Sequence, residues 1–320
     1  PTSLILYEIS EFGLYAIEKE LHHLLTSIKP TRPIQIITIL GSVTHAKRIE
    51  NVCKTFKVQT IYHAAAYKHV PMVEKNPGEA IWNNIFGTLH AAQAAINAEV
   101  ELFVLISTDK AVNPSSIMGA SKRIAEQYIQ AMNEISAHSH FIITRFGNVF
   151  GSSGSVGPIF SKQIKAGGPV TITHPEMERY FMTTTQACEL VLESGAMGIG
   201  GEIFMFDMGI PIRIVDLAHQ MISAAGLVPE EDIKIEWIGL RPGEKLQEDL
   251  ITANDILIAT HHPQIKWVKP SITSNTTSKR QKIEAFLDVM ELMKKPIQFF
   301  IPQYLFDLLK VKKNYQYLHI

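Results

Sequence analysis

The chain has 320 residues, of which 46% are apolar and 19% are charged, and its formal net charge is −1. This composition is typical of a folded protein with a sizeable core, and it excludes a disordered or fibrous chain. The balanced charge argues against nucleic acid as a partner, and no window reaches the roughly 18 consecutive apolar residues of a membrane helix. Cys53 and Cys188 lie far apart and in no metal-ligand spacing, so we expect buried, reduced thiols in a cytosolic protein and no metal site.

Short β-branched segments alternate with longer helical patterns over the first half of the chain. The pattern predicts strands at 3–8, 34–40, 60–65, 102–108 and 141–151. It predicts helices between them at 11–25, 45–56, 79–98 and 116–134. Strands that alternate with helices indicate an α/β fold with a mostly parallel, doubly wound sheet.

The regular order loosens after residue 150. Residues 151–177 are rich in Gly, Ser and Pro, and helices at 184–197 and 214–226 flank an apolar strand at 202–209. We therefore expect a Rossmann-like domain over 1–150 to which 178–213 return, and a smaller C-terminal substrate-binding lobe over 151–177 and 214–265. Residues 266–320 are expected to form a linker and a helical tail.

The informative residues lie just after predicted strands, where open α/β sheets bind their ligands. Glu8 ends the first strand, and a carboxylate there can bind adenosine ribose hydroxyls and repel a 2′-phosphate, which favours NAD over NADP. A solvated loop acid explains a lone Glu equally well. Ala64, Ala65 and Ala66 would let a cofactor pass close to the backbone, although helix packing accounts for them too.

A polar cluster follows the strand at 102–108, where Thr108, Asp109 and Lys110 place a hydroxyl, an acid and an amine side by side. Lys122 lies one helical turn beyond position 118, in the spacing by which short-chain dehydrogenases place a catalytic Tyr beside a Lys. Position 118 is Met118, which carries no proton, so Asp109 or Thr108 with ordered water must supply that step. Taken alone, Met118 fits a core residue better.

Five ordered blocks of sequence carry a resemblance to one family: YEISEFGLYAIEKEL, HAAAYKHVPMVEKNPGEAIWNNIFGT, STDKAVNPSSIMGASKR, TRFGNVFGSSGSVGPIFSKQIKAGGPVTITHPEMERYFMTTTQA and IGLRPGEKLQEDL. Over residues 3–250 the chain resembles the nucleotide-sugar 4,6-dehydratases of bacterial polysaccharide biosynthesis, lyases of the extended short-chain dehydrogenase/reductase superfamily. Met118 resembles the large, membrane-anchored branch that acts on UDP-N-acetylglucosamine and retains configuration at C5. That branch carries segments upstream, so we expect this chain to be a catalytic-domain piece.

The resemblance implies that NAD⁺ takes a hydride from C4 of UDP-N-acetylglucosamine, that water is lost across C5 and C6, and that the hydride returns to C6. The product is a UDP-4-keto-6-deoxy-hexosamine. In this scheme Thr108 binds the C4 oxygen, Asp109 is the acid that protonates the C6 hydroxyl, and Lys110 is the base at C5. Lys122 holds the nicotinamide ribose.

The same resemblance implies two sets of binding residues, although a surface salt bridge or a helix cap explains each one singly. The cofactor set is Glu8, Ser10, Ser42, Val43, Ala64, Ala65, Ala66 and Lys122. The substrate set is Lys68, His69, Asn148, Arg179, Arg213, Arg241 and Glu244. Two departures weaken the expected NAD site: no glycine-rich phosphate loop precedes Glu8, and Ser42 stands where relatives carry an adenine-binding Asp.

Two other functions fit parts of the pattern. A nucleotide-sugar 4-epimerase shares the fold, but it has no use for an adjacent acid and base. A truncated, non-catalytic Rossmann module would explain Met118 and the absent loop, but not the intact Thr108–Lys110 cluster. We expect a homo-oligomer with a UDP-sugar substrate, located in the cytoplasm and, in the full-length protein, at the cytoplasmic face of the inner membrane.

Overall fold

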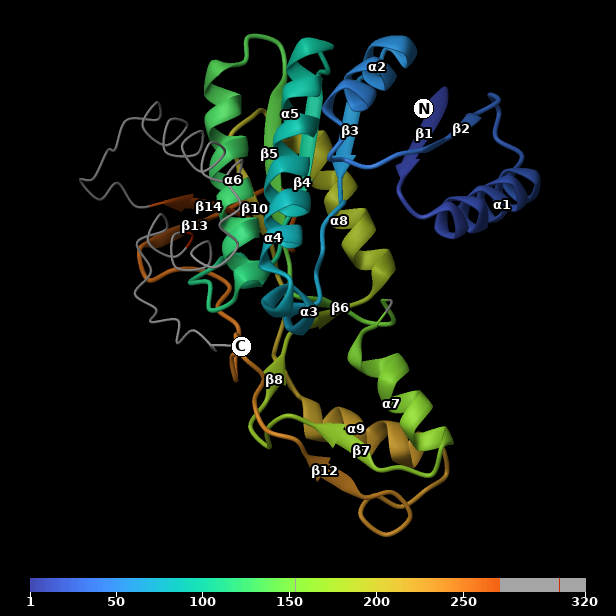
Figure 1. Cartoon of the computed structure of the whole chain (residues 1–320), viewed down its shortest axis with the longest axis vertical. Coiled ribbons are helices and arrows are strands. Elements are labelled where there is room, and N and C mark those ends of the chain that lie inside the picture. The colour runs from blue at the N-terminus through green and yellow to red at the C-terminus, as the bar shows by residue number, and fades with distance from the viewer. Residues whose placement is uncertain (153, 271–304, 306–320) are drawn as a thin grey trace.

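The computed structural model describes residues 1–152, 154–270 and 305, and it places them in two lobes (Figure 1). The larger lobe holds the main sheet and its helices. The smaller one, at the bottom of the view, holds α7 (Val156–Lys165), α9 (Ile214–Ala224), β7 (Val170–Ile172) and β12 (Ile235–Trp237). The strands β7 and β12 pair in parallel.

The main sheet has six strands in the order β13-β14-β10-β5-β4-β3. Four of them are parallel: β3 (Thr60–His63), β4 (Leu102–Ile106), β5 (His140–Arg145) and β10 (Ile203–Phe206). The predicted α/β fold with a doubly wound, mostly parallel sheet is confirmed. Two antiparallel strands that the sequence did not reveal, β13 (Asp255–Ala259) and β14 (Ile265–Pro270), extend its edge.

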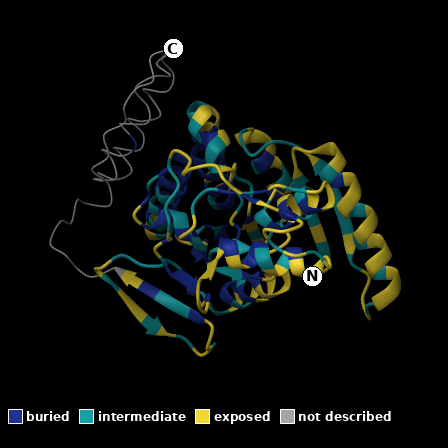
Figure 2. Cartoon of the chain, turned by 90° about the horizontal axis from the view of Figure 1, so that it is seen from below, coloured by how far each residue is buried: buried dark blue, intermediate teal, exposed yellow. Residues whose placement is uncertain are grey.

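The two faces of this sheet follow directly from the alternation of side chains along its strands. Phe103 and Leu105 point to the face covered by α5 (Gly87–Asn97) and α6 (Ile117–Ile135). Val104, between them, points to the opposite face and packs beneath α8 (Thr184–Met197). Buried residues accordingly gather in the middle of the molecule (Figure 2).

The first two strands depart from the expectation of one continuous sheet. β1 (Ser3–Glu8) pairs in parallel with β2 (Gln35–Leu40), and the two form a separate sheet beside α1 (Glu11–Ile28). Within the described part of the chain, neither strand pairs with β3. The helix α2 (Ala46–Phe56), which follows β2, packs on α5 and ties this unit to the main core.

The predicted helix at 79–98 is broken into three parts. These are α4 (Pro77–Ala80), a π-helical turn, η1 (Ile81–Phe86), and α5. A further short helix, α3 (Val70–Lys75), precedes them. The π-turn, a feature often found at functional sites, directs Asn84 into the core toward the loop that follows β3.

Short strands link the two lobes. β6 (Asn148–Val149) pairs with β9 (Phe181–Met182), and β8 (Glu178–Arg179) pairs with β11 (Ile212–Arg213). The smaller lobe has its own core, formed mainly by α7, α9, β7 and β12. The helix α7 arises within the glycine-rich stretch, where the sequence indicated only loss of order.

Several smaller expectations have mixed outcomes. Cys53 is buried as expected, but Cys188 is exposed. Residues 266–270, expected in the linker, belong to β14, and the rest of the predicted linker and tail lies outside the described residues except Leu305, which is buried in the main core. Among the described helices none is both long and apolar enough to cross a membrane.

Candidate functional site

A cavity of about 460 Å³ lies between the two lobes, at the carboxyl ends of the parallel strands. It is lined from the larger lobe by the ends of β3, β4 and β5 and the start of α6. The other side is lined by Ser152, Gly154, Ser155, Val156, Arg241, Gly243, Glu244 and Glu248. The structure thereby brings together many of the residues predicted from sequence: Ala64, Ala66, Lys68, His69, Thr108, Lys110, Met118, Lys122, Asn148, Arg179, Arg241 and Glu244.

The other predicted residues do not line this cavity. Glu8 accepts a hydrogen bond from the backbone N–H of Ser10 at 2.8 Å, and Ser10 caps α1. The hydroxyl of Ser42 bonds that of Thr44 at 2.8 Å, and Val43 packs against the main core. The last three residues absent from the lining are Ala65, Asp109 and Arg213, of which Arg213 is exposed.

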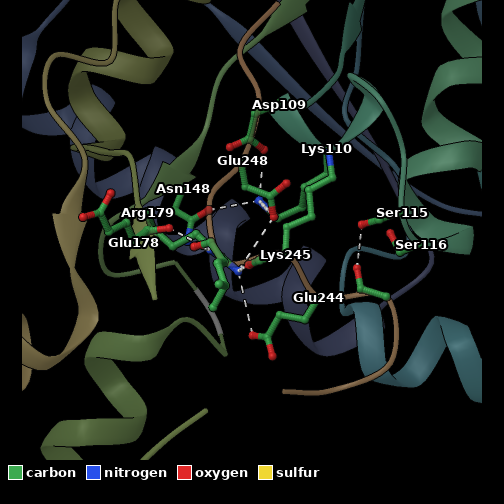
Figure 3. Close-up of polar contacts among 12 residues, drawn as sticks. Asp109, Lys110, Ser115, Ser116, Asn148, Glu178, Arg179, Glu244, Lys245 and Glu248 are labelled. Atoms are coloured by element: carbon green, nitrogen blue, oxygen red, sulfur yellow. Dashed lines mark hydrogen bonds and ion pairs between the residues drawn. The ribbon is translucent and has the colours of Figure 1, made fainter. Parts of the chain in front are cut away.

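The Thr108–Lys110 cluster is fixed by the backbone at the end of β4. The N–H of Asp109 donates to the carbonyl oxygen of Phe146 at 3.1 Å, and Thr108 caps the 3₁₀ turn η2 (Asp109–Ala111). Lys110 Nζ donates to Asp109 Oδ1 at 2.9 Å and to Asn148 Oδ1 at 3.1 Å (Figure 3). The amine is therefore held at the cavity wall by groups from two strand ends.

Asp109 lies one layer behind that wall. Its side chain is 1% exposed, and its Oδ1 accepts hydrogen bonds from Thr108 Oγ1 at 2.8 Å and from Lys110. Its Oδ2 is buried and has no hydrogen-bond partner among the described residues, and it faces Gly147. Asp109 is therefore connected to the cavity through its hydrogen bonds with Thr108 and Lys110, which line it.

The helix α6 carries both Met118 and Lys122 to the cavity. Ser116 caps its first turn, and Glu74 Oε1 accepts the N–H of Ile117 at 2.7 Å. Lys122 Nζ donates to the carbonyl oxygen of Ile106 at 2.6 Å. Burial lowers the pKa of Lys122 to about 8, although the nearby charge of Glu126 opposes this shift. Met118 is both a core residue and a part of the cavity wall.

Gly119, on the same helix, lies against the backbone of Lys110. A Cβ at this position would collide with the Lys110 carbonyl oxygen. Gly119→Ala should therefore lower the free energy of unfolding by about 1–3 kcal/mol and displace the amine from the cavity wall. Urea unfolding measures the first effect. Gly78→Ala is the matched control, because nothing lies within 4 Å of the added carbon, and it should leave stability almost unchanged.

A buried ion pair that the sequence did not reveal braces the ends of β4 and β5. Glu126 accepts hydrogen bonds from Arg145 Nε at 2.7 Å and Nη2 at 2.6 Å, and from Ser107 Oγ at 2.7 Å. Burial raises the pKa of Glu126, but the charge and hydrogen bonds of Arg145 outweigh it and lower that pKa to about 2. The position of Glu126, one helical turn after Lys122 on α6, was the sequence signal that pointed to this residue.

The segment 241–249 crosses from the smaller lobe and closes one side of the cavity. Arg179, predicted to bind substrate, donates to the carbonyl oxygens of Glu178, Lys245 and Leu246 and so holds this segment in place. At the other end of the segment, Ser115 Oγ donates to the carbonyl oxygen of Gly243 at 2.9 Å. The result is a strap joined to both lobes.

The loop after β3 is held in a similar way. Asn84 is fully buried, and its side chain accepts the N–H of Tyr67 at 2.7 Å and donates to the carbonyl oxygen of Tyr67 at 3.0 Å. This pair of bonds fixes the segment that carries Lys68 and His69 into the cavity. No cluster of metal-ligating side chains occurs in the described ranges.

The chain matches the family model described as "Polysaccharide biosynthesis protein" over residues 1–270. It is 51% identical to the capsular polysaccharide biosynthesis protein CapD of Staphylococcus aureus over 264 residues, which are 82% of this chain and 42% of CapD. It is 36% identical to an inverting UDP-N-acetylglucosamine 4,6-dehydratase of Campylobacter jejuni, over 73% of this chain and 67% of that protein. It is 37% identical to a UDP-glucose 4-epimerase of Rickettsia akari, over 68% of this chain and 62% of that protein.

Solved structures that share the fold include the following two. Pen from Bacillus thuringiensis superposes with a TM-score of 0.75 at 31% identity, over 90% of each chain. The dTDP-glucose 4,6-dehydratase DesIV from Streptomyces venezuelae was solved with NAD and TYD bound. It superposes with a TM-score of 0.64 at 19% identity, over 77% of this chain and 87% of DesIV. The chain spans less than half the length of CapD. It belongs to the polysaccharide biosynthesis protein family, an extended short-chain dehydrogenase/reductase group that includes nucleotide-sugar dehydratases and epimerases.

Proposed function

We propose that this chain is the catalytic domain of an NAD-dependent UDP-N-acetylglucosamine 4,6-dehydratase. The observation that carries the proposal is the convergence of Thr108, Lys110 and Lys122 on one cavity, with Asp109 bonded directly to the first two. An acid, a base and a cofactor-binding amine in one place are what a dehydration at C5 and C6 needs. The similarity to the Campylobacter dehydratase supports the same reaction class.

The residues of the cavity fit the nicotinamide end of NAD. Ala64 and Ala66 leave room beside the backbone, and Lys122 presents an amine that can bind the ribose hydroxyls. NAD⁺ supplies reversible acceptance of a hydride, which allows oxidation at C4 and reduction at C6 with no net redox change. The residues proposed to bind the adenosine end of NAD lie outside the cavity; they are Glu8, Ser10, Ser42 and Val43.

In the proposed reaction Lys110 takes the C5 proton and Thr108 bonds the C4 oxygen. Asp109 supplies the proton that the departing C6 hydroxyl requires. In the structure Thr108 Oγ1 donates to Asp109 Oδ1, so the acid role requires that Asp109 takes up a proton and that this bond reverses. The Thr108 hydroxyl then transfers its own proton to the C6 oxygen and receives the proton of Asp109. On the nucleotide side, Arg241 lines the cavity and offers a donor fork suited to phosphate oxygens.

Product analysis tests the proposal. The full chain is incubated with NAD⁺ and UDP-N-acetylglucosamine, and the nucleotide sugars are separated and weighed by mass spectrometry. A dehydratase gives a product lighter by one water with a 4-keto group. An unchanged mass with a new hexosamine isomer would identify an epimerase, the second candidate, which the similarity to the Rickettsia protein favours. Unreacted substrate alone, beside an active Campylobacter enzyme, would contradict both.

A further inference from the structure

A second carboxyl group, Glu248, reaches the reaction centre from the strap. It lies in the cavity wall opposite Lys110, and its side chain is 5% exposed. The family resemblance implies substrate binding by Glu244 of the same segment. In the structure Glu248, and not Glu244, contacts the proposed base. Glu244 contacts Arg179, whereas Glu248 contacts both Arg179 and Lys110.

Two carboxylates therefore flank one amine. Lys110 Nζ lies 2.9 Å from Asp109 Oδ1 and 3.9 Å from Glu248 Oε1 (Figure 3). The two carboxylates come from distant parts of the chain, since Asp109 belongs to η2 and Glu248 to the strap. The first of them lies behind the wall, whereas the second faces the space that a substrate would enter.

Four charged residues, from η2, β8 and the strap, act on the carboxyl group of Glu248. Burial raises the pKa of Glu248, and the negative charge of Asp109 adds to this, while Lys110, Arg179 and Lys245 oppose it. Arg179 Nη2 is 3.8 Å from Glu248 Oε1 and belongs to β8. The net effect raises the pKa of Glu248. The two cations within 4 Å, Lys110 and Arg179, favour the ionised form of the carboxyl, which can balance an ammonium ion.

We propose that Glu248 is a positioning residue that acts through Lys110: its carboxylate holds the amine at the cavity wall and stabilises the ammonium ion that forms when Lys110 takes the substrate proton. In that step the C5–H bond breaks, its electron pair stays on the sugar as an enolate, and the proton forms a new N–H bond on Lys110. The inference rests on the proposed dehydratase function. It adds a residue of the strap to the acid–base apparatus and makes catalysis depend on how the strap is closed.

The test compares four forms of the full chain: wild type, Glu248→Gln, Glu248→Asp and Asp249→Asn. Asp249 is the matched control, because it is the next carboxylate of the strap and it pairs with Lys245 outside the cavity. The first readout is competitive labelling of amines between pH 7 and 11, followed by peptide mass spectrometry, with the exposed Lys47 as the internal reference. It reports the protonation of the Lys110 amine whether or not the protein turns over.

In Glu248→Gln the midpoint of Lys110 labelling should fall by about 1 pH unit, because a nearby negative charge favours the protonated amine. Glu248→Asp should move it less, and Asp249→Asn should leave it unchanged. In the activity assay, Glu248→Gln should lower kcat about tenfold with little change in KM and move the acidic limb of the pH profile to lower pH. Circular dichroism shows whether each variant is folded. If Glu248→Gln does not fold, the Lys110 midpoint of Glu248→Asp tests the proposal instead.

Equal Lys110 midpoints in wild type and in the folded Glu248 variants would overturn the proposal. So would an equal shift in Asp249→Asn, since the effect would then come from the charge of the strap as a whole. A wild-type chain that gives no dehydrated sugar, combined with a shifted midpoint in Glu248→Gln, would contradict the proposed function and leave the coupling of Glu248 to Lys110 standing.

Discussion

Replacing Lys110 with methionine should lower the rate of dehydration by about 10³-fold, because it removes the base that takes the C5 proton. Methionine keeps much of the length of the side chain, so the cavity wall stays filled. The loss should fall on kcat, and the acidic limb of the pH–rate profile that depends on this amine should disappear. Steady-state kinetics across pH measures both effects.

Lys165→Met is the control for this prediction, because Lys165 is an exposed residue at the end of α7 and does not line the cavity. It should keep the wild-type rate and profile. An unchanged pH–rate profile in Lys110→Met would remove the support for Lys110 as the base and would favour a different proton acceptor in the cavity.

Replacing Arg145 with methionine should lower the free energy of unfolding by about 3–5 kcal/mol, because it leaves the carboxylate of Glu126 buried without its main partner. Both side chains are almost fully buried, and they join α6 to the ends of β4 and β5. Urea unfolding measures the loss. Lys54→Met is the control: it breaks the exposed Lys54–Glu50 pair on α2 and should leave stability almost unchanged.

The same ion pair predicts a pH dependence. The pKa of Glu126 is lowered from 4.5 to about 2, so its ionised form binds Arg145 in the folded state and the stabilisation is fully present above about pH 4.5. It is lost as the pH falls from about 4.5 to about 2. The stability of the wild type should therefore drop more steeply over this window than that of Arg145→Met, and equal slopes would contradict the assignment.

The sequence predicted best what depends on local periodicity. The alternation of strands and helices from β3 to β5 is confirmed, because each apolar run there faces a buried layer on both sides of the sheet. The π-turn η1 was not predicted, because its side-chain spacing differs little from that of an α-helix. The strand β13 was not predicted because its apolar run, residues 256–259, shows no polar alternation, and at the edge of the sheet several of these side chains are exposed.

Contacts made at long range explain the other differences. Glu126 and Arg145 are 19 residues apart, and Glu248 and Lys110 are 138 apart, so no local pattern pairs them. The strand exits that bear Thr108, Lys110 and Asn148 were predictable as one site, because parallel strands end at one edge of their sheet. The adenosine set was predicted from the same rule, yet Glu8 lies on the separate β1–β2 sheet and takes part in a local turn.

The most direct test of the account follows one deuterium atom. UDP-N-acetylglucosamine labelled with deuterium at C4 is incubated with the NAD⁺-loaded chain, and the product is examined by NMR. The account predicts a UDP-4-keto-6-deoxy sugar in which the label has moved to C6 of the same molecule, because the hydride taken from C4 is returned after water has left. Label found at C4 of a UDP-hexosamine epimer, or a dehydrated product without deuterium at C6, would contradict it.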